Sequence, residues 1–412
     1  MSAVRVRAPP AQDRHARADI SVHHGEMSPE PTGPDGGGRA DRPRGRGLVR
    51  RRRPRPPRSR RSRVVRAALF SLAGVLLVSG VGITALWVKL DGNISQIDID
   101  SALGPDRPED SPNGSMDLLV LGSDSRAGTN GAYGSEPGAR ADTAMVVHLD
   151  AGRDTATVVS IPRDTLVSRP ACDRTGGGTA PAQARSMFNE SYTVGGPACT
   201  VKTVEEMTGL RMDHYLEVDF TGFSRLIDTL GGVEITTTEA IDDRDSKLDL
   251  PAGTHTLDGE QALALVRTRK AVGDGSDLSR IQLQHTFLQA LADQVSGLGL
   301  VTDPKRLYDL ADTATSTVTT DKDLASVSEL AGLARTLQGI DTDRIRMTTL
   351  PVTYDPADPN RVVPMETQSR AVWDALRHDR PVPESALRGS AAREGTVQSV
   401  TSGGGAPARA AE

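Results

Sequence analysis

Apolar and polar residues follow two different periods along the middle of the chain, and the changes of period predict strands and helices in turn. The run MDLLVLGSDSR begins at Met116 and predicts a buried strand at 117–121, followed at once by small and charged residues. Further strands are predicted at 144–150, 155–161, 214–219, 233–237 and 345–350. Helices are predicted at 186–192, 197–207, 304–317, 322–338 and 366–378, after caps at Thr221 and Asp258, and from Asp277. Strands that alternate with helices indicate an α/β fold.

One segment is apolar throughout and differs from the rest. Residues 67–88 carry no charge and lie between Arg66 and Lys89. At about 1.5 Å per residue a helix of this length crosses the hydrocarbon core, and the segment is too long for the apolar part of a signal peptide. We therefore predict one transmembrane helix at 67–89.

The charge on either side of this helix predicts its orientation. Residues 1–66 contain 18 arginines and 6 acidic residues, a net charge of +12, which is typical of a disordered basic tail. By the positive-inside rule this tail is cytoplasmic, and the rest of the chain is extracytoplasmic. Without aromatic residues or a fold signal, the tail is better explained by attraction to anionic lipid than by specific nucleic-acid binding.

The exported part is expected to contain one catalytic domain. We predict a linker at 90–115, the domain at 116–380 and a disordered tail at 381–412 that is rich in Gly, Ala, Ser and Pro. Cys172 and Cys199 are the two cysteines of the chain. Because a disulfide is permitted outside the membrane and two cysteines without matching histidines are a poor metal site, we expect a disulfide.

Charged residues lie at the ends of three of the predicted strands. The sets are Asp124 with Arg126, Arg140 with Asp142, and Arg163 with Asp164. Strand ends that run into small-residue turns are where open α/β sheets bind ligands. Three such sets are hard to attribute to surface decoration, although Asp164 and Thr165 equally fit a simple turn cap.

Arg267 and Arg269 are two positions apart, so they face the same side if the backbone between them is extended. Two forked guanidinium groups directed at one point suit a phosphate or diphosphate. A helix that begins at Ser276 or Asp277 would add its free N–H groups to this anion site. Two alternatives remain: a surface salt-bridge network for the arginines, and an N-cap role for Asp277. Asn189 is read as a helix cap or a loop contact.

The sequence resembles the LytR-CpsA-Psr family of cell-envelope proteins. The resemblance rests on LVLGSDSR (119–126), RADTAMVVHLD (140–150), VSIPRDT (159–165), FNESYTVGG (188–196), VDFTGFSRLIDTLGGVEI (218–235) and LDGEQALALVRTRK with DLSRIQLQ (257–284). It implies an α/β/α sandwich with a central mixed sheet. It also implies a membrane-anchored enzyme that moves a glycopolymer from a polyprenyl diphosphate carrier to peptidoglycan through a phosphodiester bond.

The resemblance also implies roles for individual residues. Arg267, Arg269, Asp277 and Arg163 would be catalytic, Arg126, Arg140, Arg280 and Gln284 would bind the diphosphate, and Asp124 and Asp142 would hold Mg²⁺ or Mn²⁺. Asp277 is the candidate base for the acceptor hydroxyl. The family more often has Arg at the position of Leu283, so Lys270 or His285 would have to supply that contact.

Two other functions are compatible with the same residues. A polyprenyl diphosphate hydrolase would use water as the acceptor, and a membrane-anchored regulator would hold the lipid carrier without turnover. Carboxylates at strand ends favour metal-assisted phosphoryl transfer over passive binding. The glycopolymer, the prenyl length and the oligomeric state cannot be read from the sequence.

Overall fold

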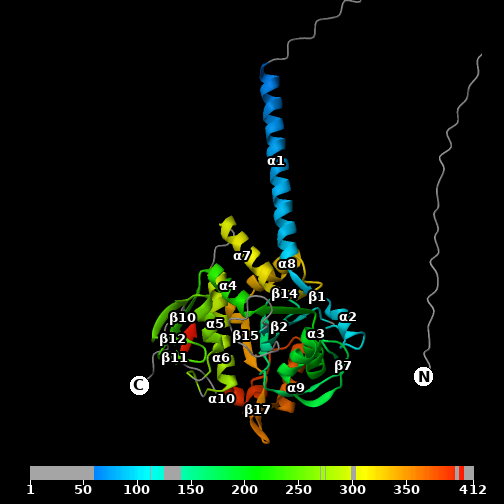
Figure 1. Ribbon diagram of the computed structural model, residues 1–412, viewed down its shortest axis with the longest axis vertical. Helices are drawn as coiled ribbons and strands as arrows, with labels where there is room; N and C mark the ends of the chain where they lie inside the picture. Colours follow the sequence, from blue (N-terminus) through cyan, green and yellow to red (C-terminus); the bar gives the residue numbers. More distant parts are fainter. Residues whose placement is uncertain are drawn as a thin grey trace, which may run out of the picture. The chain divides into compact units, whose positions relative to one another are not determined.

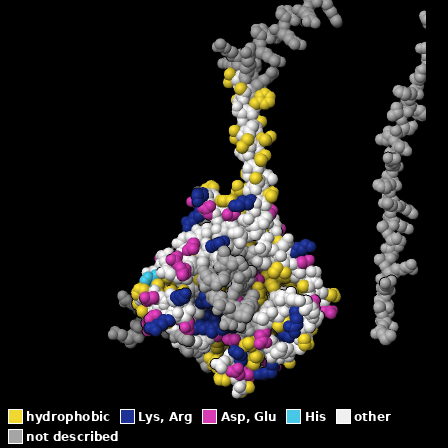
Figure 2. Space-filling view, in the orientation of Figure 1, with side chains coloured by type: hydrophobic (Ala, Val, Ile, Leu, Met, Phe, Trp, Pro, Cys, Tyr) yellow, Lys and Arg dark blue, Asp and Glu magenta, His cyan; other side chains and the backbone are white. Residues whose placement is uncertain are grey.

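The computed structural model describes residues 60–111, 113–124, 141–269, 271–273, 275–297, 303–394 and 399–402. Its first element is a long helix, α1 (Arg60–Asn93), which begins before the predicted start at 67. Ala67–Asn93 is long and apolar enough to cross a bilayer. Figure 2 shows apolar side chains along the surface of this helix. The side chains of Phe70 and Leu77 are exposed. The predicted apolar helix is confirmed, and lipid is the solvent that its surface fits.

The centre of the fold is a mixed sheet of seven strands, as predicted. Its order is β1 (Ser95–Ile97), β14 (Val318–Asp321), β9 (His214–Asp219), β2 (Met116–Ser123), β3 (Ala141–Leu149), β4 (Ala156–Ser160) and β15 (Ile345–Thr349). β2 pairs antiparallel with β3 and parallel with β9, and β4 pairs parallel with β15. The parallel pairs require crossover connections, and helices supply them.

Helices cover both faces of this sheet, which gives the predicted α/β/α layers (Figure 1). Leu119 and Leu121 of β2 pack with α2 (Ile99–Leu103), α3 (Phe188–Thr208) and α9 (Glu366–Arg377) on one face. Leu118 points the other way and packs with residues of α8 (Val327–Gln338) and its C-terminal turn. The alternation of apolar residues along β2 therefore serves two cores.

A second core lies beside the sheet and supports the candidate site. It contains α4 (Phe220–Leu230), α5 (Gly259–Arg267) and α6 (Asp277–Gly297), with the strands β10 (Val233–Thr237), β11 (Ile241–Asp243), β12 (Leu248–Leu250), β13 (Gly253–Leu257) and β18 (Val400–Ser402). Asp258 caps α5 through a capping box with Gln261, as its position predicted. A Cβ on Gly259 would lie 2.1 Å from the Ser224 carbonyl oxygen, so a glycine is required where α4 and α5 touch.

The remaining elements are short strand pairs, the helix α7 and shorter helical segments. They are β5 (Leu166–Arg169) with β8 (Gln183–Met187), β6 (Cys172–Asp173) with β7 (Thr179–Ala180), β16 (Val352–Asp355) with β17 (Asp358–Pro364), α7 (Pro304–Thr317), η3 (Thr342–Arg344), η4 (Glu384–Leu387) and α10 (Ala391–Glu394). Cys172 and Cys199 form the expected disulfide, which ties β6 to α3.

Three helices show where local signals were right and wrong. α3 is assigned as one helix, but Gly195 and Gly196 have non-helical backbone angles. This kink divides α3 into the two helices that were predicted. The predicted Thr221 cap of α4 is wrong: the side chain of Asp219 accepts from the Gly222 amide at 2.7 Å. α8 begins at Val327 rather than 322, because Ser326 caps it through the Glu329 amide.

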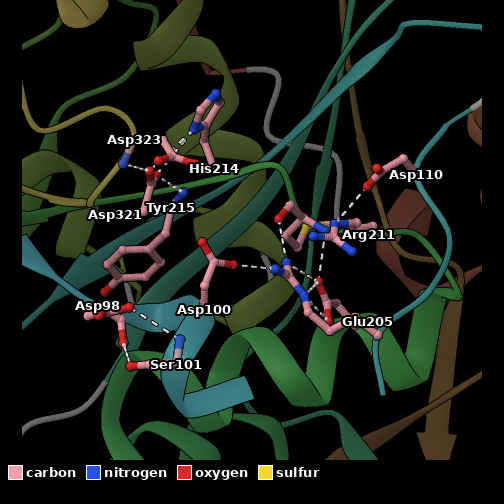
Figure 3. A network of polar contacts seen from close by, with 12 residues as sticks. Asp98, Asp100, Ser101, Asp110, Glu205, Arg211, His214, Tyr215, Asp321 and Asp323 are labelled. Carbon is pink, nitrogen blue, oxygen red and sulfur yellow. Dashed lines mark hydrogen bonds and ion pairs between the residues drawn. The ribbon is translucent and has the colours of Figure 1, made fainter. Parts of the chain in front are cut away.

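The predicted linker at 90–115 is instead part of the fold. β1 pairs with β14 at the edge of the sheet, and α2 buries Ile99 and Leu103. The Arg107 side chain binds Glu205 of α3, with Nη2 2.6 Å from Oε1, and also Asp100 of α2 at 2.5 Å. Figure 3 shows Asp100 and Glu205 directed at the same guanidinium group in this network. The segment was misjudged because its buried residues are few and widely spaced.

The predicted tail from 381 onward is also wrong for the residues that the structure describes. Ala386, Ala391 and Ala392 are buried in the core beneath α9. Val400 is buried as well, and β18 pairs antiparallel with β10. A composition of small residues therefore concealed a segment that packs closely.

Candidate active site

Asp142 is displaced from the regular pairing of its strand. In the β2–β3 register Gly122 pairs with Thr143 and Ser123 pairs with Ala141, so Asp142 is the extra residue of a β-bulge. Such a bulge re-aims a side chain at the end of a strand. Asp124 follows Ser123 on the neighbouring strand, so the two predicted metal ligands come from the same end of adjacent strands.

Three arginines surround the carboxylate of Asp277. Oδ1 of Asp277 lies 3.4 Å from Arg163 Nε and 3.4 Å from Arg269 Nη2, and it also contacts Arg280. Arg163 Nη1 continues the cluster to Asp142 Oδ1 at 2.6 Å. The predicted residues from three separate segments are therefore brought together.

The N-terminus of α6 leaves Asp277 available to this cluster. The Ser279 amide donates to Ser276 Oγ at 3.3 Å, so Ser276 is the capping residue. Both carboxylate oxygens of Asp277 lack a hydrogen bond of good geometry among the described residues, although the guanidinium groups lie at ion-pair distance. The alternative that Asp277 acts only as an N-cap is therefore wrong.

A cleft of about 260 Å³ lies beside the arginines. Its lining includes Asp142, Arg163, Arg267, Arg269, Arg280 and Gln284, all predicted site residues. Thr268 has an extended backbone, φ −59° and ψ 137°, so the residues on either side of it reach one space, as the Arg-x-Arg spacing predicted. The cleft thus offers several guanidinium groups to one anionic ligand.

Burial and charge act in opposite directions on these arginines. For Arg280, burial is the largest effect and lowers the pKa to about 10, with Asp277 opposing it and the neighbouring arginines adding to it. For Arg163, burial also lowers the pKa, but Asp142, Asp277 and Asp164 together raise it above its usual value. Both side chains therefore remain charged at neutral pH, in a site where an anion relieves their mutual repulsion.

Backbone and aromatic contacts hold the Arg-x-Arg segment in place. The Arg269 amide donates to Asp243 Oδ2 at 3.1 Å, and the Arg267 guanidinium lies 4.8 Å from the centre of the Phe220 ring. Gln284 donates from Nε2 to the Val266 carbonyl at 3.1 Å, so it stabilises the end of α5 from α6.

Some predicted residues are not part of the described site. Arg126, Arg140 and Lys270 lie outside the described residues. Leu283 is fully buried in the second core. His285 does not replace an arginine there, because its Nε2 binds Ser160 Oγ at 2.8 Å and its ring lines a different cavity with Thr348 and Thr349.

A second and larger cleft, of about 710 Å³, meets the first at Arg163 and Arg269. Its other lining residues include Asp164, Asn189, Glu190, Asp277, Tyr354, Asn360 and Arg361. Sequence reasoning missed Tyr354 and Arg361, which lie in no motif. It also missed Asp243 in the smaller cleft, although the acidic run DDRD was a visible signal.

The ring of His285 predicts how stability depends on pH. Burial lowers its pKa to about 4. An unfolded histidine titrates near pH 6.5, so the unfolded state binds more protons between about pH 4 and 6.5 and stability falls as the pH is lowered. From pH 7 to pH 5 the loss should be about 2 kcal/mol.

The measurement is the free energy of unfolding of the wild type and of His285→Gln at several pH values. Because glutamine does not titrate, the difference between the two proteins should change by that amount over this range. His148 and His214, whose pKa values are raised through Asp117 and Asp321 against the effect of burial, are common to both proteins and cancel. A constant difference would show that His285 is not held neutral by burial.

Comparisons with known proteins agree with this geometry. The model of the LytR_cpsA_psr family matches residues 86–378. The cell wall biosynthesis protein LcpA of Corynebacterium glutamicum is 32% identical over 306 residues, which is 68% of this chain and 58% of that protein. The teichoic acid transferase TagT of Bacillus subtilis is 37% identical over 193 residues, 45% of this chain and 55% of TagT. The matches therefore span less than two thirds of the length of these two relatives.

Solved structures are similar in fold. A LytR-Csp2A-Psr enzyme from Actinomyces oris has a TM-score of 0.52 and 26% identity, covering 69% of this chain and 96% of that one. TagT bound to LIIa-WTA has a TM-score of 0.51 and 28% identity, covering 69% and 98%. With the family model matched over most of the chain, the protein belongs to the LytR_cpsA_psr family.

Proposed function

We propose that this protein transfers a glycopolymer from a polyprenyl diphosphate carrier to peptidoglycan. The observation that carries the proposal is the convergence of Arg163, Arg269 and Arg280 on Asp277 beside the smaller cleft. Clustered guanidinium groups at this site suit a diphosphate, although the exported part of the chain is acidic overall. The names of TagT and LcpA, which concern teichoic acid transfer and cell wall biosynthesis, support the same class of function.

The reaction is a displacement at the phosphorus that carries the glycan. The acceptor hydroxyl forms a new P–O bond, the bond between the two phosphates breaks, and prenyl phosphate leaves. Arg163 and Arg269 border both clefts, so they are placed to neutralise charge on the transferring group. Asp277 lines the larger cleft and is our candidate for the group that takes the proton of the acceptor hydroxyl.

Two carboxylates fit a Mg²⁺ or Mn²⁺ ion at this site. Asp142 is re-aimed by the bulge and Asp124 ends the adjacent strand, and carboxylate oxygens are the ligands that these ions prefer. Among the described residues no group of three or more His, Cys, Asp or Glu side chains could hold a metal alone. Phosphate oxygens and water would complete the ligand set, and the ion would withdraw charge from the diphosphate.

The proposed location is the outer face of the cell membrane, with the N-terminus in the cytoplasm. At the end of α1, Lys89 Nζ lies 2.8 Å from Asp312 Oδ1 and 2.8 Å from the Tyr308 hydroxyl of α7. The Val327 amide donates to Asp91 at 2.7 Å. These contacts join the apolar helix to the domain. The anchor therefore keeps the domain and its clefts at the membrane surface where the lipid-linked donor lies. That raises the effective concentration of the donor.

The test uses the full-length protein in detergent with a labelled saccharide on polyprenyl diphosphate, soluble peptidoglycan fragments and Mg²⁺. We expect label on peptidoglycan and its loss with a chelator. Asp142→Asn should lower transfer by about a hundredfold or more, because it weakens the metal site and the Arg163 ion pair.

Asp341→Asn is the control, since that exposed carboxylate lines neither cleft and its ion pair is with Arg344 at 3.9 Å. Release of free sugar phosphate would support the hydrolase. Lipid binding without turnover, unchanged in Asp142→Asn, would support the regulator. Transfer that persists in chelator would overturn the metal assignment.

A further inference from the structure

We infer that the larger cleft is a saccharide subsite that holds the acceptor glycan, an inference that rests on the proposed function. Arg163 and Arg269 line both clefts, and the other lining residues of the two clefts differ. In a displacement at phosphorus the attacking and leaving oxygens are roughly in line, on opposite sides of the transferring group. If the diphosphate occupies the smaller cleft, the attacking hydroxyl approaches from the larger one.

The lining of the larger cleft suits sugar hydroxyls better than a lipid chain. Asn189 is 9% exposed and lines the cleft, and its Oδ1 has no hydrogen-bond partner among the described residues. It does not cap α3, whose N-cap position is Met187 without a side-chain bond. A buried acceptor atom without a partner is costly unless a ligand or water donates to it. A sugar hydroxyl is a donor of the right kind.

One aromatic ring is exposed at the same cleft. Tyr354 of β16 is 44% exposed and lines the cleft with Asn360 of β17. An exposed aromatic ring with nearby amide groups can pack on the apolar face of a pyranose while the amides bind its hydroxyls. A prenyl chain would need a mainly apolar lining, whereas this cleft combines apolar residues such as Met187 and Leu278 with charged and amide side chains.

The β16–β17 hairpin is tied to the segment that carries Arg163. Arg361 Nη1 lies 3.4 Å from Asp164 Oδ1, and the Val362 amide donates to the Asp164 carbonyl at 3.4 Å. Asp164 directly follows Arg163, so a saccharide held on the hairpin has a fixed position relative to the shared arginine. The hairpin is therefore the element that positions the acceptor hydroxyl for attack.

The test varies one substrate at a time with the full-length protein in detergent. We expect Tyr354→Ala to raise the KM for the peptidoglycan fragment about tenfold, the effect of one lost contact, and to leave the KM for the lipid-linked donor unchanged. Tyr354→Phe keeps the ring and should behave like the wild type. Asn189→Ala should raise the same acceptor KM, provided that its thermal unfolding matches the wild type.

The outcomes separate the two possible sources of the saccharide. A rise in the donor KM alone would assign the cleft to the donor's glycan and overturn the acceptor assignment. Unchanged KM values for both substrates in Tyr354→Ala would overturn the saccharide subsite itself. Binding of the peptidoglycan fragment in the absence of donor, measured by saturation-transfer NMR, tests the subsite independently of transfer. A failure of the subsite can therefore be told from a failure of the proposed function. Binding that Tyr354→Ala weakens supports the subsite even if the wild type transfers nothing, and binding that it leaves unchanged contradicts it.

Discussion

Arg163→Ala is expected to reduce the rate of transfer by about a thousandfold, the size of effect seen when a charge-stabilising group is removed from a phosphoryl-transfer site. Arg163 borders both clefts and forms ion pairs with Asp142 at 2.6 Å, Asp277 at 3.4 Å and Asp164 at 3.6 Å. Without it each of these three carboxylates would lose a cationic neighbour. The site would then be less positive and would bind and stabilise the diphosphate less well.

The measurement is kcat/KM for the lipid-linked donor at saturating acceptor. Arg163→Lys should retain part of the rate, because lysine restores the charge but not the planar fork that spans Asp142 and Asp277. Arg344→Ala is the matched control, since Arg344 is exposed and lines neither cleft. A rate in Arg163→Ala within a few fold of the wild type would remove Arg163 from the catalytic set.

Glu205→Ala is expected to have the largest effect on stability, about 3–5 kcal/mol, the cost of leaving one member of a buried ion pair without its partner. The side chains of Arg107 and Glu205 are 7% and 4% exposed, and two of the Arg107 nitrogens bind Glu205. Glu205 also accepts from the Met212 amide at 3.0 Å. The substitution therefore removes the buried carboxylate from the Arg107 guanidinium, which keeps only the exposed carboxylate of Asp100 and the Met212 carbonyl among the partners described, and it also removes the acceptor of the Met212 amide.

Urea unfolding of the full-length protein in detergent, followed by the near-UV circular dichroism of the domain, measures this loss. Arg211→Ala is a control from the same network, because Arg211 pairs with Asp110, whose side chain is 76% exposed (Figure 3). Exposed pairs contribute about 0–1 kcal/mol, so the control should unfold almost like the wild type. Equal unfolding midpoints for the two variants would contradict the view that Arg107 and Glu205 fix the segment before β2.

The central strands and much of the smaller cleft could be predicted because their signals are local. Apolar runs predicted β2, β3 and β4, and the spacing of Arg267 and Arg269 predicted that both line one space, as they do. The roles assigned to these residues stay predictions until they are measured. Charge at the ends of adjacent strands was enough to indicate where a ligand site would be.

The larger cleft could not be predicted, because its walls come from segments that no local pattern connects. Asn189, Asp277 and Tyr354 meet only through the packing of α3, α6 and the β16–β17 hairpin. The segments before β2 and after α9 were misjudged for a related reason. Their few buried side chains acquire meaning only from partners elsewhere in the chain.

The return of β18 to β10 has a consequence for shortened forms of this protein. A chain that ended at residue 394, before β18, would keep the residues named in both clefts and the core residues Ala386, Ala391 and Ala392. It would lose the partner of Ile235, Thr236 and Thr237, so the outer side of β10 would present unpaired amides and carbonyls. An open strand edge is a template for pairing with another chain. Such a form would have an intact site and a tendency to self-associate, so its solubility would depend on a strand far from the chemistry.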